Sequence, residues 1–530
     1  MIENRILVSQ LVNENITRFR RKTPNAADEE ISISDFKAVG DGITDDINAF
    51  FDAMSYLDSI GGGVLNLESG KTYAVSGGIP AVSNVTINMS RSSIKLIQGS
   101  VLPMIYYNSS ETLTNFNIVD GILDGNNVAQ NIINVTEPSP AAPNKTWSYS
   151  VLFNVEIKNS GSIGLYCPIP GRVRMIGCYV HHNDIGLAWD REHLDVYNSS
   201  IEQNRIGIRS TGNHFVWIHG VVAHNSEKGW TTEGAGLGTY TNVYEGAFLG
   251  CTFIDNGSIS LEGLIDYSRI EGSRFLDAST HIKNARGCMI LGNQFGGEFD
   301  YAIDDIGNDC IINGNRFANG VNGVRTKTTT NGIQIVNNFF SILTGQPIRL
   351  VNPLRLDVKD NSLKSITGTE GIYIDANSNV TTNFTVSGNR LSDIAGVGIK
   401  FVGPTSGDVN DWHIDENYIW NTDAEAIRCE GTTASYGSSI SRNKIVDANM
   451  NNVAGTHAIY TSRIHAYSLC CNNIIRNTGS GKADHAIFFA NASGTDLLFD
   501  GNVARNMLGT YSYDLPLSAV VGDNVGTFAP

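Results

Sequence analysis

The chain has 530 residues, of which 41% are hydrophobic and only 17% are charged, and its net charge is −16 at pH 7. This acidic balance argues against a nucleic-acid-binding protein, which needs Lys and Arg to meet phosphates. The 55 glycines and 55 asparagines exclude a helical bundle as the main body, because both residue types favour turns. No run of 18 apolar residues predicts a membrane span. The eight cysteines, with Cys470 and Cys471 adjacent, are expected to be buried free thiols.

Residues 1–30 differ in composition from the rest of the chain. Apolar residues with partly helical spacing precede a basic cluster that ends at Lys22. This pattern favours either a short helix that docks to a partner protein or bundles with its own copies, or a solvated tail. The N-terminus has no long apolar stretch, so we expect no signal peptide, synthesis in a cytoplasm, and exit by another route if the protein leaves the cell.

The next segment predicts a helix over residues 45–60. Thr44 is the expected N-cap, and Asp45 and Asp46 suit the positive end of the helix dipole. Gly61 ends the helix, and residues 64–67 read as a strand. We expect the helix to cover the open hydrophobic end of a solenoid. Its apolar stripe comprises Ile47, Phe50, Phe51, Met54, Leu57 and Ile60.

The rest of the chain repeats. An asparagine followed two places later by an apolar residue recurs at intervals of 22 to 30 residues. Smaller residues continue the frame upstream, at Cys178, Ser199, Gly220, Cys251 and Ser273. A short strand signal, a small residue followed by an apolar one, comes about nine to fifteen residues after most markers. The asparagine markers are Asn293, Asn315, Asn338, Asn361, Asn389, Asn417, Asn443, Asn472 and Asn502.

One repeat of this length, with two or three short strands, is one turn of a parallel β-helix. Stacked turns place like residues about 4.8 Å apart, so an internal asparagine at a bend can bond the asparagines above and below. Leucine-rich repeats and propellers need signatures that are missing. The predicted fold is therefore all-β: a right-handed, single-stranded parallel β-helix with an N-terminal capping helix. The expected divisions are residues 1–30 for docking or oligomerisation, 31–150 for the cap and first coils, 151–506 for the body, and 507–530 for a short C-terminal tail.

The segment from Asp35 to Tyr73 resembles the start of the pectate-lyase-like β-helix superfamily. The resemblance rests on the pattern Asp-Phe-x-Ala-x-Gly-Asp-Gly-x-x-Asp-Asp, followed by a predicted helix, three glycines and a strand. In overall character the chain is most similar to the bacteriophage tailspike polysaccharide depolymerases. The resemblance implies a virion protein that acts at the bacterial surface as a homotrimer and binds, and usually cleaves, a capsule or O-antigen glycan. Fold alone does not establish such a function. Many tailspikes also have a long C-terminal domain, whereas only about two dozen residues follow Asn506 in this sequence.

Strand alternation predicts which side chains of the repeated strand face outward. Six of these thirteen positions are basic although the chain is acidic, which favours a face that grips an anionic or polyhydroxyl polymer. Stacked surface charges that merely alternate are the other interpretation. The row reads Ala188, Arg209, Thr231, Glu262, Lys283, Asp304, Arg325, Arg349, Tyr373, Lys400, Arg428, Tyr460 and Phe488. A second outward row includes Asp190, Glu233, Leu264, Ile306 and Val351, and its apolar members predict the trimer interface.

Glycoside hydrolysis needs two carboxyl groups that flank the scissile bond. Glu233 and Glu262 lie on adjacent predicted turns, with Cα atoms about 8 Å apart, which favours inversion. We predict that they are the catalytic pair, with Asp190 and Asp304 as the reserve pair. Surface ion pairs between stacked Glu and Lys are the competing interpretation.

Substrate contacts are predicted around this pair. A longer turn after Glu233 carries two tyrosines, and aromatic rings can stack on sugars. Trp189 and Trp230 are expected to point inward. No cofactor and no metal site are expected, because the histidines show no zinc spacing. The predicted substrate-binding residues are Arg209, Lys283, Arg325, Trp217, Tyr240 and Tyr244.

Two other functions remain open. A polysaccharide lyase acting on a uronate could use Arg209 or Lys283 beside Glu262, although no cluster of calcium ligands is evident. Asp304-Asp305 with Asp309 resembles the paired aspartates of polygalacturonases only faintly. A non-catalytic adhesin or structural spike would keep the basic row and need no carboxyl pair.

Overall fold

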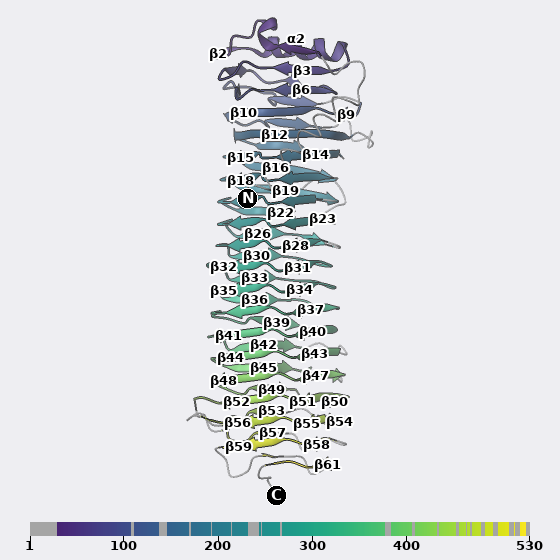
Figure 1. Cartoon of the computed structure of the whole chain (residues 1–530), viewed down its shortest axis with the longest axis vertical. Helices are drawn as coiled ribbons and strands as arrows, with labels where there is room; N and C mark the ends of the chain where they lie inside the picture. The colour runs from purple at the N-terminus through teal and green to yellow at the C-terminus, as the bar shows by residue number, and fades with distance from the viewer. Residues whose placement is uncertain are drawn as a thin grey trace. The chain divides into compact units, whose positions relative to one another are not determined.

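The computed structural model describes residues 29–107, 111–136, 146–168, 171–191, 193–213, 215–231, 243–244, 246–265, 268–376, 383–404, 409–431, 434–451, 455–462, 464–466, 469–478, 483–490, 497–507, 513–514 and 520–525. The chain forms two compact units, Met1–Ala247 (unit 1) and Phe248–Pro530 (unit 2). Within each unit, short parallel strands stack one above another (Figure 1). Parallel β-coils, predicted from the repeats, are confirmed by this pairing. The described part contains no helix that is both long and apolar enough to cross a membrane.

Unit 1 begins with the predicted helix. The elements are β1 (Glu30–Ser32), the 3-10 helix η1 (Ile33–Phe36), β2 (Asp41–Asp45), α2 (Ile47–Ser59) and β3 (Gly63–Asn66). The N-cap is Asp46 and not Thr44, whose hydroxyl donates to Asp41 from within β2. The carboxylate of Asp46 accepts hydrogen bonds from the backbone N–H groups of residues 39 and 40 instead of capping the helix.

One face of α2 is buried, as predicted, but the stripe is narrower than expected. Phe50, Met54 and Leu57 are fully buried, whereas Phe51 is 51% exposed and Ile60 is 36% exposed. Phe50 meets the ring of Tyr73 edge-on, with the centroids 5.8 Å apart. The helix therefore packs through every third or fourth residue, and its flanks remain in solvent.

Each coil of unit 1 contributes strands to three stacks. The long strands β10 (Asn117–Val128) and β12 (Trp147–Ser160) pair in parallel. On its other side, β12 pairs in parallel with both β14 and β15. Stack 1 contains β14 (Gly171–Ile176), β17 (Leu194–Tyr197) and β20 (Phe215–Ile218); stack 2 contains β15 (Tyr179–His181), β18 (Ser200–Glu202) and β21 (Val221–Ala223); stack 3 contains β13 (Ile163–Cys167), β16 (Ile185–Arg191), β19 (Ile206–Asn213) and β22 (Lys228–Thr231).

Unit 2 repeats the same three stacks. Stack 1 contains β28 (Arg269–Glu271), β31 (Met289–Leu291), β34 (Ile311–Asn313), β37 (Ile333–Val336), β40 (Arg355–Lys359), β43 (Asn383–Ser387), β47 (Trp412–Asp415), β51 (Ser439–Ser441), β55 (Leu469–Cys471), β58 (Leu498–Asp500) and β61 (Val520–Val521). Stack 2 contains β25 (Thr252–Ile254), β29 (Arg274–Leu276), β32 (Gln294–Gly296), β35 (Arg316–Ala318), β38 (Phe339–Ser341), β41 (Ser362–Ile366), β44 (Arg390–Ile394), β48 (Tyr418–Thr422), β52 (Lys444–Ala448), β56 (Ile474–Arg476) and β59 (Val503–Arg505).

Stack 3 of unit 2 carries the candidate site. It contains β26 (Ile259–Glu262), β30 (Thr280–Lys283), β33 (Tyr301–Asp304), β36 (Asn322–Arg325), β39 (Ile348–Val351), β42 (Glu370–Asp375), β45 (Val397–Val402), β49 (Ile427–Glu430), β53 (Ile459–Thr461), β57 (Ile487–Phe489) and β60 (Tyr513–Asp514). Ile372, Ile374 and Ile399 point inward and are fully buried.

The asparagine column forms the predicted ladder at the bend between stacks 1 and 2. Oδ1 of Asn338 accepts from the backbone N–H and the side-chain amide of Asn315, at 2.9 and 3.0 Å. The pattern repeats from Asn293 to Asn524, but Asn473 occupies the position that the sequence assigned to Asn472. A second ladder, which the sequence analysis missed, joins Asn183, Asn204 and Asn225 in unit 1.

Apolar side chains stack inside the coils in the same way. The rings of Phe253, Phe275, Phe295, Phe317 and Phe340 form a continuous column, with successive centroids 4.5 to 4.9 Å apart. All five are at most 1% exposed. The eight cysteines are buried free thiols, as expected. The parallel pairing continues beyond residue 506, the predicted end of the body, since β58 pairs with β61.

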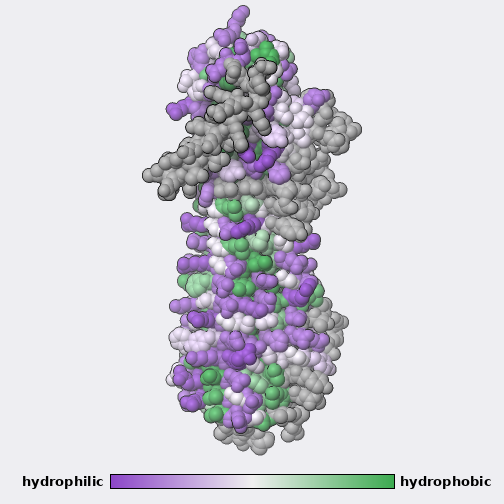
Figure 2. Space-filling view, turned by 45° about the vertical axis from the view of Figure 1, so that its right-hand side comes forward, coloured by the Kyte–Doolittle hydropathy of each residue, from purple (hydrophilic) through white to green (hydrophobic). Residues whose placement is uncertain are grey.

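The prediction that apolar residues of the second outward row form an exposed trimer surface is wrong for one of them. Ile306 is fully buried, because Asp305 has a positive φ of 57° and the left-handed residue reverses the alternation. Val351 is partly buried, and the side chain of Leu264 lies outside the described residues. Other apolar side chains of unit 2 are exposed, among them Ile474 at 50% and Trp420 at 42%. Figure 2 shows apolar groups among polar ones towards the C-terminal end of the visible face.

Candidate functional site

The predicted outward row exists in unit 2 and is called the outer row below. The strand register aligns its members one above another in stack 3. Successive partners are Glu262 with Lys283, Lys283 with Asp304, Arg325 with Arg349, Arg349 with Tyr373, Tyr373 with Lys400, Lys400 with Arg428, Arg428 with Tyr460, and Tyr460 with Phe488. In-register parallel strands thus bring side chains from residues 262 to 488 onto one face.

Asp304 is a carboxylate of the outer row that two cations hold. Its Oδ1 accepts a hydrogen bond from Arg325 Nε at 2.6 Å, and its Oδ2 lies 2.8 Å from Lys327 Nζ. The side chain is only 6% exposed. Burial alone would raise the pKa of Asp304, but the two cations outweigh it and hold the pKa below the usual value. Asp304 is therefore ionised at neutral pH.

Glu262 lies two strands away on the same face, and its carboxylate contacts Lys283 and Asn284. Its Oε1 lies 3.7 Å from Lys283 Nζ and 3.5 Å from the amide nitrogen of Asn284. The carboxyl side chain is 10% exposed. Two strand steps place the Cα atoms of Glu262 and Asp304 about 9.6 Å apart. Side chains of this length can bring the two carboxyl groups within the separation that an inverting glycosidase uses.

The basic members of the outer row are largely neutralised by acidic neighbours. Lys400 Nζ lies 3.7 Å from Glu370 and 3.6 Å from Glu430. Arg428 pairs with Glu425 at 3.1 Å and with Glu430 at 2.5 Å. The structure thus shows many of the paired charges that the alternating-charge interpretation predicted. The outer row presents a mixed, hydrogen-bonding surface and not a strongly positive one.

Aromatic rings lie between these charges. The guanidinium carbon of Arg325 lies 3.7 Å from the ring centroid of Tyr301, and that of Arg349 lies 5.6 Å from the ring of Tyr373. Burial, and then the Asp375 carboxylate, raise the pKa of Tyr373 to about 12. Asp375 Oδ1 and Arg349 Nε are buried and make no hydrogen bond in the described structure. This part of the face therefore retains unmet hydrogen-bonding capacity.

Four predicted site residues come together on successive strands: Glu262, Lys283, Asp304 and Arg325. Arg209 lies in unit 1, on β19, between Ala188 and Thr231 of the neighbouring strands. As expected, Trp189 and Trp230 point inward and are almost fully buried.

The other predicted site residues are described in part or not at all. Glu233 and Tyr240 lie outside the described residues, so the proposed pair of Glu233 with Glu262 remains a prediction. The backbones of Asp190, Trp217 and Tyr244 lie in strands, but their side chains are outside the description. No group of three His, Cys, Asp or Glu side chains within the described ranges is arranged to hold a metal ion.

Unit 1 carries a polar cluster that the sequence analysis did not predict. Lys158 Nζ donates to Glu156 Oε1 at 2.6 Å, and His181 Nε2 lies 3.1 Å from the same oxygen. The ring of Tyr179 stacks on His181, with the centroids 4.0 Å apart. Glu156 pairs with Tyr179, and Lys158 with His181, in the register of β12 and β15. The sequence signal is the matched spacing of Glu-x-Lys and Tyr-x-His on neighbouring turns.

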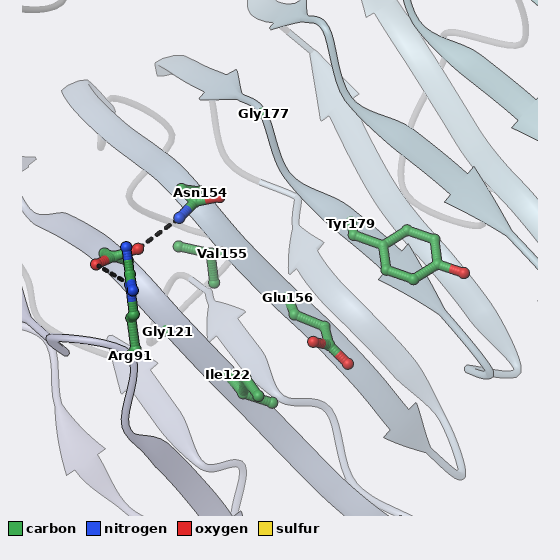
Figure 3. Close-up of a pocket in the computed structure, with 9 residues that line it drawn as sticks. Arg91, Gly121, Ile122, Asn154, Val155, Glu156, Gly177 and Tyr179 are labelled. Atoms are coloured by element: carbon green, nitrogen blue, oxygen red, sulfur yellow. Dashed lines mark hydrogen bonds and ion pairs between the residues drawn. The ribbon is translucent and has the colours of Figure 1, made fainter. Parts of the chain in front are cut away.

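A shallow cavity of about 250 Å³ lies beside this cluster (Figure 3). Its lining comes from stacked strands: Ile122 of β10, Glu156 of β12 and Tyr179 of β15 are register partners. At the other side, the amide of Asn154 donates to Asp120 at 2.5 Å, and Arg91 lies 3.9 Å from the same carboxylate.

Comparison with known proteins finds no matching family model. Over 110 residues the chain is 34% identical to mannuronan C5-epimerase AlgE1 of Azotobacter vinelandii, a match that covers 18% of this chain and 8% of that protein. The match to AlgE3 of the same organism has the same identity and covers 18% of this chain and 6% of that protein. The chain thus spans less than a tenth of the length of these curated relatives.

Similar solved structures include phage and bacterial proteins. A mutant tailspike of E. coli bacteriophage HK620, in complex with a pentasaccharide, is 14% identical, with 94% of this chain and 78% of that chain covered and a TM-score of 0.37. The A-module of mannuronan C-5 epimerase AlgE6 of Azotobacter vinelandii is 15% identical, with coverages of 94% and 99% and a TM-score of 0.24. ORF18 of Geobacillus virus E2 is 16% identical, with coverages of 52% and 59% and a TM-score of 0.36.

Proposed function

We propose that the chain binds and cleaves a bacterial surface polysaccharide, capsule or O-antigen, as an endo-acting glycoside hydrolase. The observation that carries the proposal is the outer row of unit 2. There, two poorly exposed carboxyl groups, Glu262 and Asp304, lie within an extended, in-register line of aromatic and hydrogen-bonding side chains. A linear polymer can lie along such a line and meet repeated contacts.

The two carboxyl groups suit different roles. Asp304, held ionised by Arg325 and Lys327, would stabilise positive charge that develops on the sugar ring. Glu262, whose Oε1 lies 3.7 Å from Lys283 Nζ, would exchange a proton with the glycosidic oxygen. Glu233 remains the predicted base that activates water, and Asp190 the reserve group.

The Lys and Arg side chains of the outer row are paired with acidic side chains, and this pairing bears on the charge of the substrate. A lyase must neutralise the carboxylate of a uronate, which calls for uncompensated cations. In the outer row, Lys283, Arg325, Lys400 and Arg428 all face acidic partners. The pairing of these cations supports a substrate that is a polyhydroxyl polymer of low charge. It also favours hydrolysis over elimination as the reaction.

A second candidate is action on a uronic-acid polymer, including a polysaccharide lyase. The short match to two proteins named mannuronan C5-epimerases favours it, since C5 chemistry on a uronate begins with removal of the C5 proton. Arg209 and Lys283 are the residues predicted for such a reaction. The match covers 18% of the chain, which makes this the weaker candidate. A non-catalytic adhesin would use the same face without cleavage.

We also propose that the protein is a homotrimeric virion tail component that acts at the bacterial surface, with residues 1–30 docking to another tail or baseplate protein. The support is the opening segment that resembles the pectate-lyase-like β-helix superfamily, the similarity of the chain to tailspikes in overall character, and the exposed apolar side chains of unit 2, such as Trp420 and Ile474.

The test is to incubate the protein with purified capsules and O-antigens from candidate hosts and with mannuronan. Release of reducing ends without ultraviolet-absorbing product supports hydrolysis. An unsaturated uronate, seen by its ultraviolet absorbance, supports the lyase instead. Binding without any change in polymer length supports an adhesin, and neither binding nor cleavage contradicts the proposed function.

A further inference from the structure

The polar cavity of unit 1 lies outside the outer row and is formed by other stacks. Its lining belongs to β10, β12 and β15 and to the turns beside them, whereas the outer row belongs to stack 3 of unit 2. At about 250 Å³ it is smaller than the roughly 300–1,000 Å³ of pockets for drug-sized ligands. A single six-membered ring with polar substituents is the size of ligand that it suits.

Glu156 is positioned by its neighbours and keeps one oxygen for a ligand. Lys158 and His181 both contact Oε1, and within the described part of the chain no group hydrogen-bonds Oε2. Burial would raise the pKa of Glu156, but the hydrogen bonds from Lys158 and His181 outweigh it and lower the pKa. The carboxylate is therefore ionised at neutral pH and can accept hydrogen bonds from hydroxyl groups through Oε2.

Tyr179 supplies a flat apolar wall at the edge of the cavity. The residue is 36% exposed, and its ring orientation is fixed by stacking on His181 at a centroid distance of 4.0 Å. Gly177, on the turn that leads to Tyr179, has no atom within 4 Å of the position where a Cβ would lie, so the mouth beside it is open. Figure 3 shows Glu156 between Tyr179 on one side and Asn154 on the other.

We propose that this cavity is a second carbohydrate-binding subsite that holds one pyranose unit of a glycan. The sugar ring packs against Tyr179, and its hydroxyl groups donate to Glu156 Oε2 and pair with the side chain of Asn154. The ligand class rests on the proposed function, because the pyranose is taken to be part of the polymer that the protein binds. The subsite gives the chain a second binding site for that polymer. Binding at two sites raises the avidity, although the subsite itself makes no contact with the outer row.

The test uses saturation-transfer NMR with the full chain and small pyranosides at millimolar concentration: the methyl pyranosides of glucose, galactose, mannose and rhamnose, and sodium glucuronate. At least one should give a signal with the wild type. Its affinity should fall about tenfold or more in Tyr179→Ala and in Glu156→Gln, since each loses a stacking surface or a charged acceptor. Tyr179→Phe should bind like the wild type.

Two controls separate the sites. Tyr149→Ala removes another exposed tyrosine of β12, at 70% exposure and outside the cavity lining, and should change nothing. Tyr373→Ala alters the outer row and should leave the signal that depends on Tyr179 unchanged. The subsite is refuted if no pyranoside binds, or if Tyr179→Ala and Glu156→Gln, folded by their melting curves, bind like the wild type. Pyranoside binding at this cavity with no polysaccharide cleaved would support the subsite and count against the proposed hydrolase.

Discussion

Asp304 Oδ1 accepts a hydrogen bond from Arg325 Nε at 2.6 Å, while the guanidinium of Arg325 covers the ring of Tyr301 at 3.7 Å. Arg325 Nη1 also donates to the Tyr301 hydroxyl at 2.6 Å. One cation on β36 thus fixes a carboxylate and an aromatic ring that both belong to the neighbouring strand, β33. The arrangement explains how a solenoid of short strands can hold side chains rigidly on an outer face.

Replacing Arg325 by Met should lower the free energy of unfolding by about 2 kcal/mol, because a mostly buried carboxylate loses its shortest charged hydrogen bond. The pKa of Asp304 should rise towards its usual value. In the wild type, the lowered pKa of Asp304 stabilises the fold at pH values above the usual pKa of an aspartate, and this stabilisation is lost as the pH falls through the lowered pKa. The variant lacks much of this contribution, so its free energy of unfolding should fall less on acidification. Denaturant unfolding at several pH values measures both effects. Arg316→Met, an exposed cation on β35, is the matched control and should have little effect.

Catalysis is tested by Glu262→Gln and Glu233→Gln, which keep shape and remove charge. Each should reduce turnover of the cleaved polysaccharide at least about a hundredfold, because general acid–base catalysis is lost, while binding and melting temperature persist. Glu298→Gln, at an exposed position of unit 2, is the control. If both variants cleave at nearly the wild-type rate, the site lies at Asp190 or Asp304 or elsewhere.

Replacing one asparagine of the ladder should strongly lower the free energy of unfolding. Asn338→Ala removes a side chain that donates to Asn361 Oδ1 at 3.0 Å and accepts from Asn315. Several buried groups then lose partners, so the free energy of unfolding should fall by about 3 kcal/mol or more. Gln334→Ala, an exposed amide on β37, should cost far less. Equal effects of the two substitutions would mean that the ladder contributes little.

His281 predicts acid sensitivity of the core. The ring lies between Phe275, Phe295 and Phe299, and burial lowers its pKa to about 3 from the usual 6.5. Below pH 6.5 the unfolded chain binds a proton that the folded chain does not, so this residue costs stability progressively as the pH falls towards about 3. His281→Leu should lose that dependence, as pH-resolved thermal melts would show. An unchanged pH profile would be contrary to this account.

Light scattering tests assembly. A homotrimer should have about three times the chain mass of 57.3 kDa. A stable mass near that of one chain would rule it out under the conditions used.

The coil pattern could be predicted because every turn must fill the same interior, so Asn and small residues recur at fixed bends. Single positions were harder. Asn472 and Asn473 are adjacent, and the sequence does not reveal that Asn472 takes a positive φ of 59° while Asn473 enters the ladder. The buried position of Ile306 was missed for a similar reason, since the left-handed Asp305 reverses the expected alternation.

The candidate site was predictable in the same uneven way. Strand parity placed Glu262, Lys283, Asp304 and Arg325 on one face, because register and alternation are backbone properties. Ion pairs between stacked Glu and Lys were one of the two interpretations, and Glu262 with Lys283 forms such a pair. The partners of Lys400 were not predicted, since they depend on side-chain rotamers and on residues beside the row, such as Glu370. The cluster around Glu156 and His181 was missed because its members come from two turns and match only after the register is known.

The most direct test of the central claim is the chain length of one polysaccharide that the protein binds, measured by size-exclusion chromatography with light scattering before and after incubation. The account predicts that the wild type shortens the polymer and releases reducing ends, and that the double variant Glu262→Gln, Asp304→Asn leaves its length unchanged while still binding it. A polymer that stays intact with the wild type, or one that the double variant shortens at the same rate, would contradict the account.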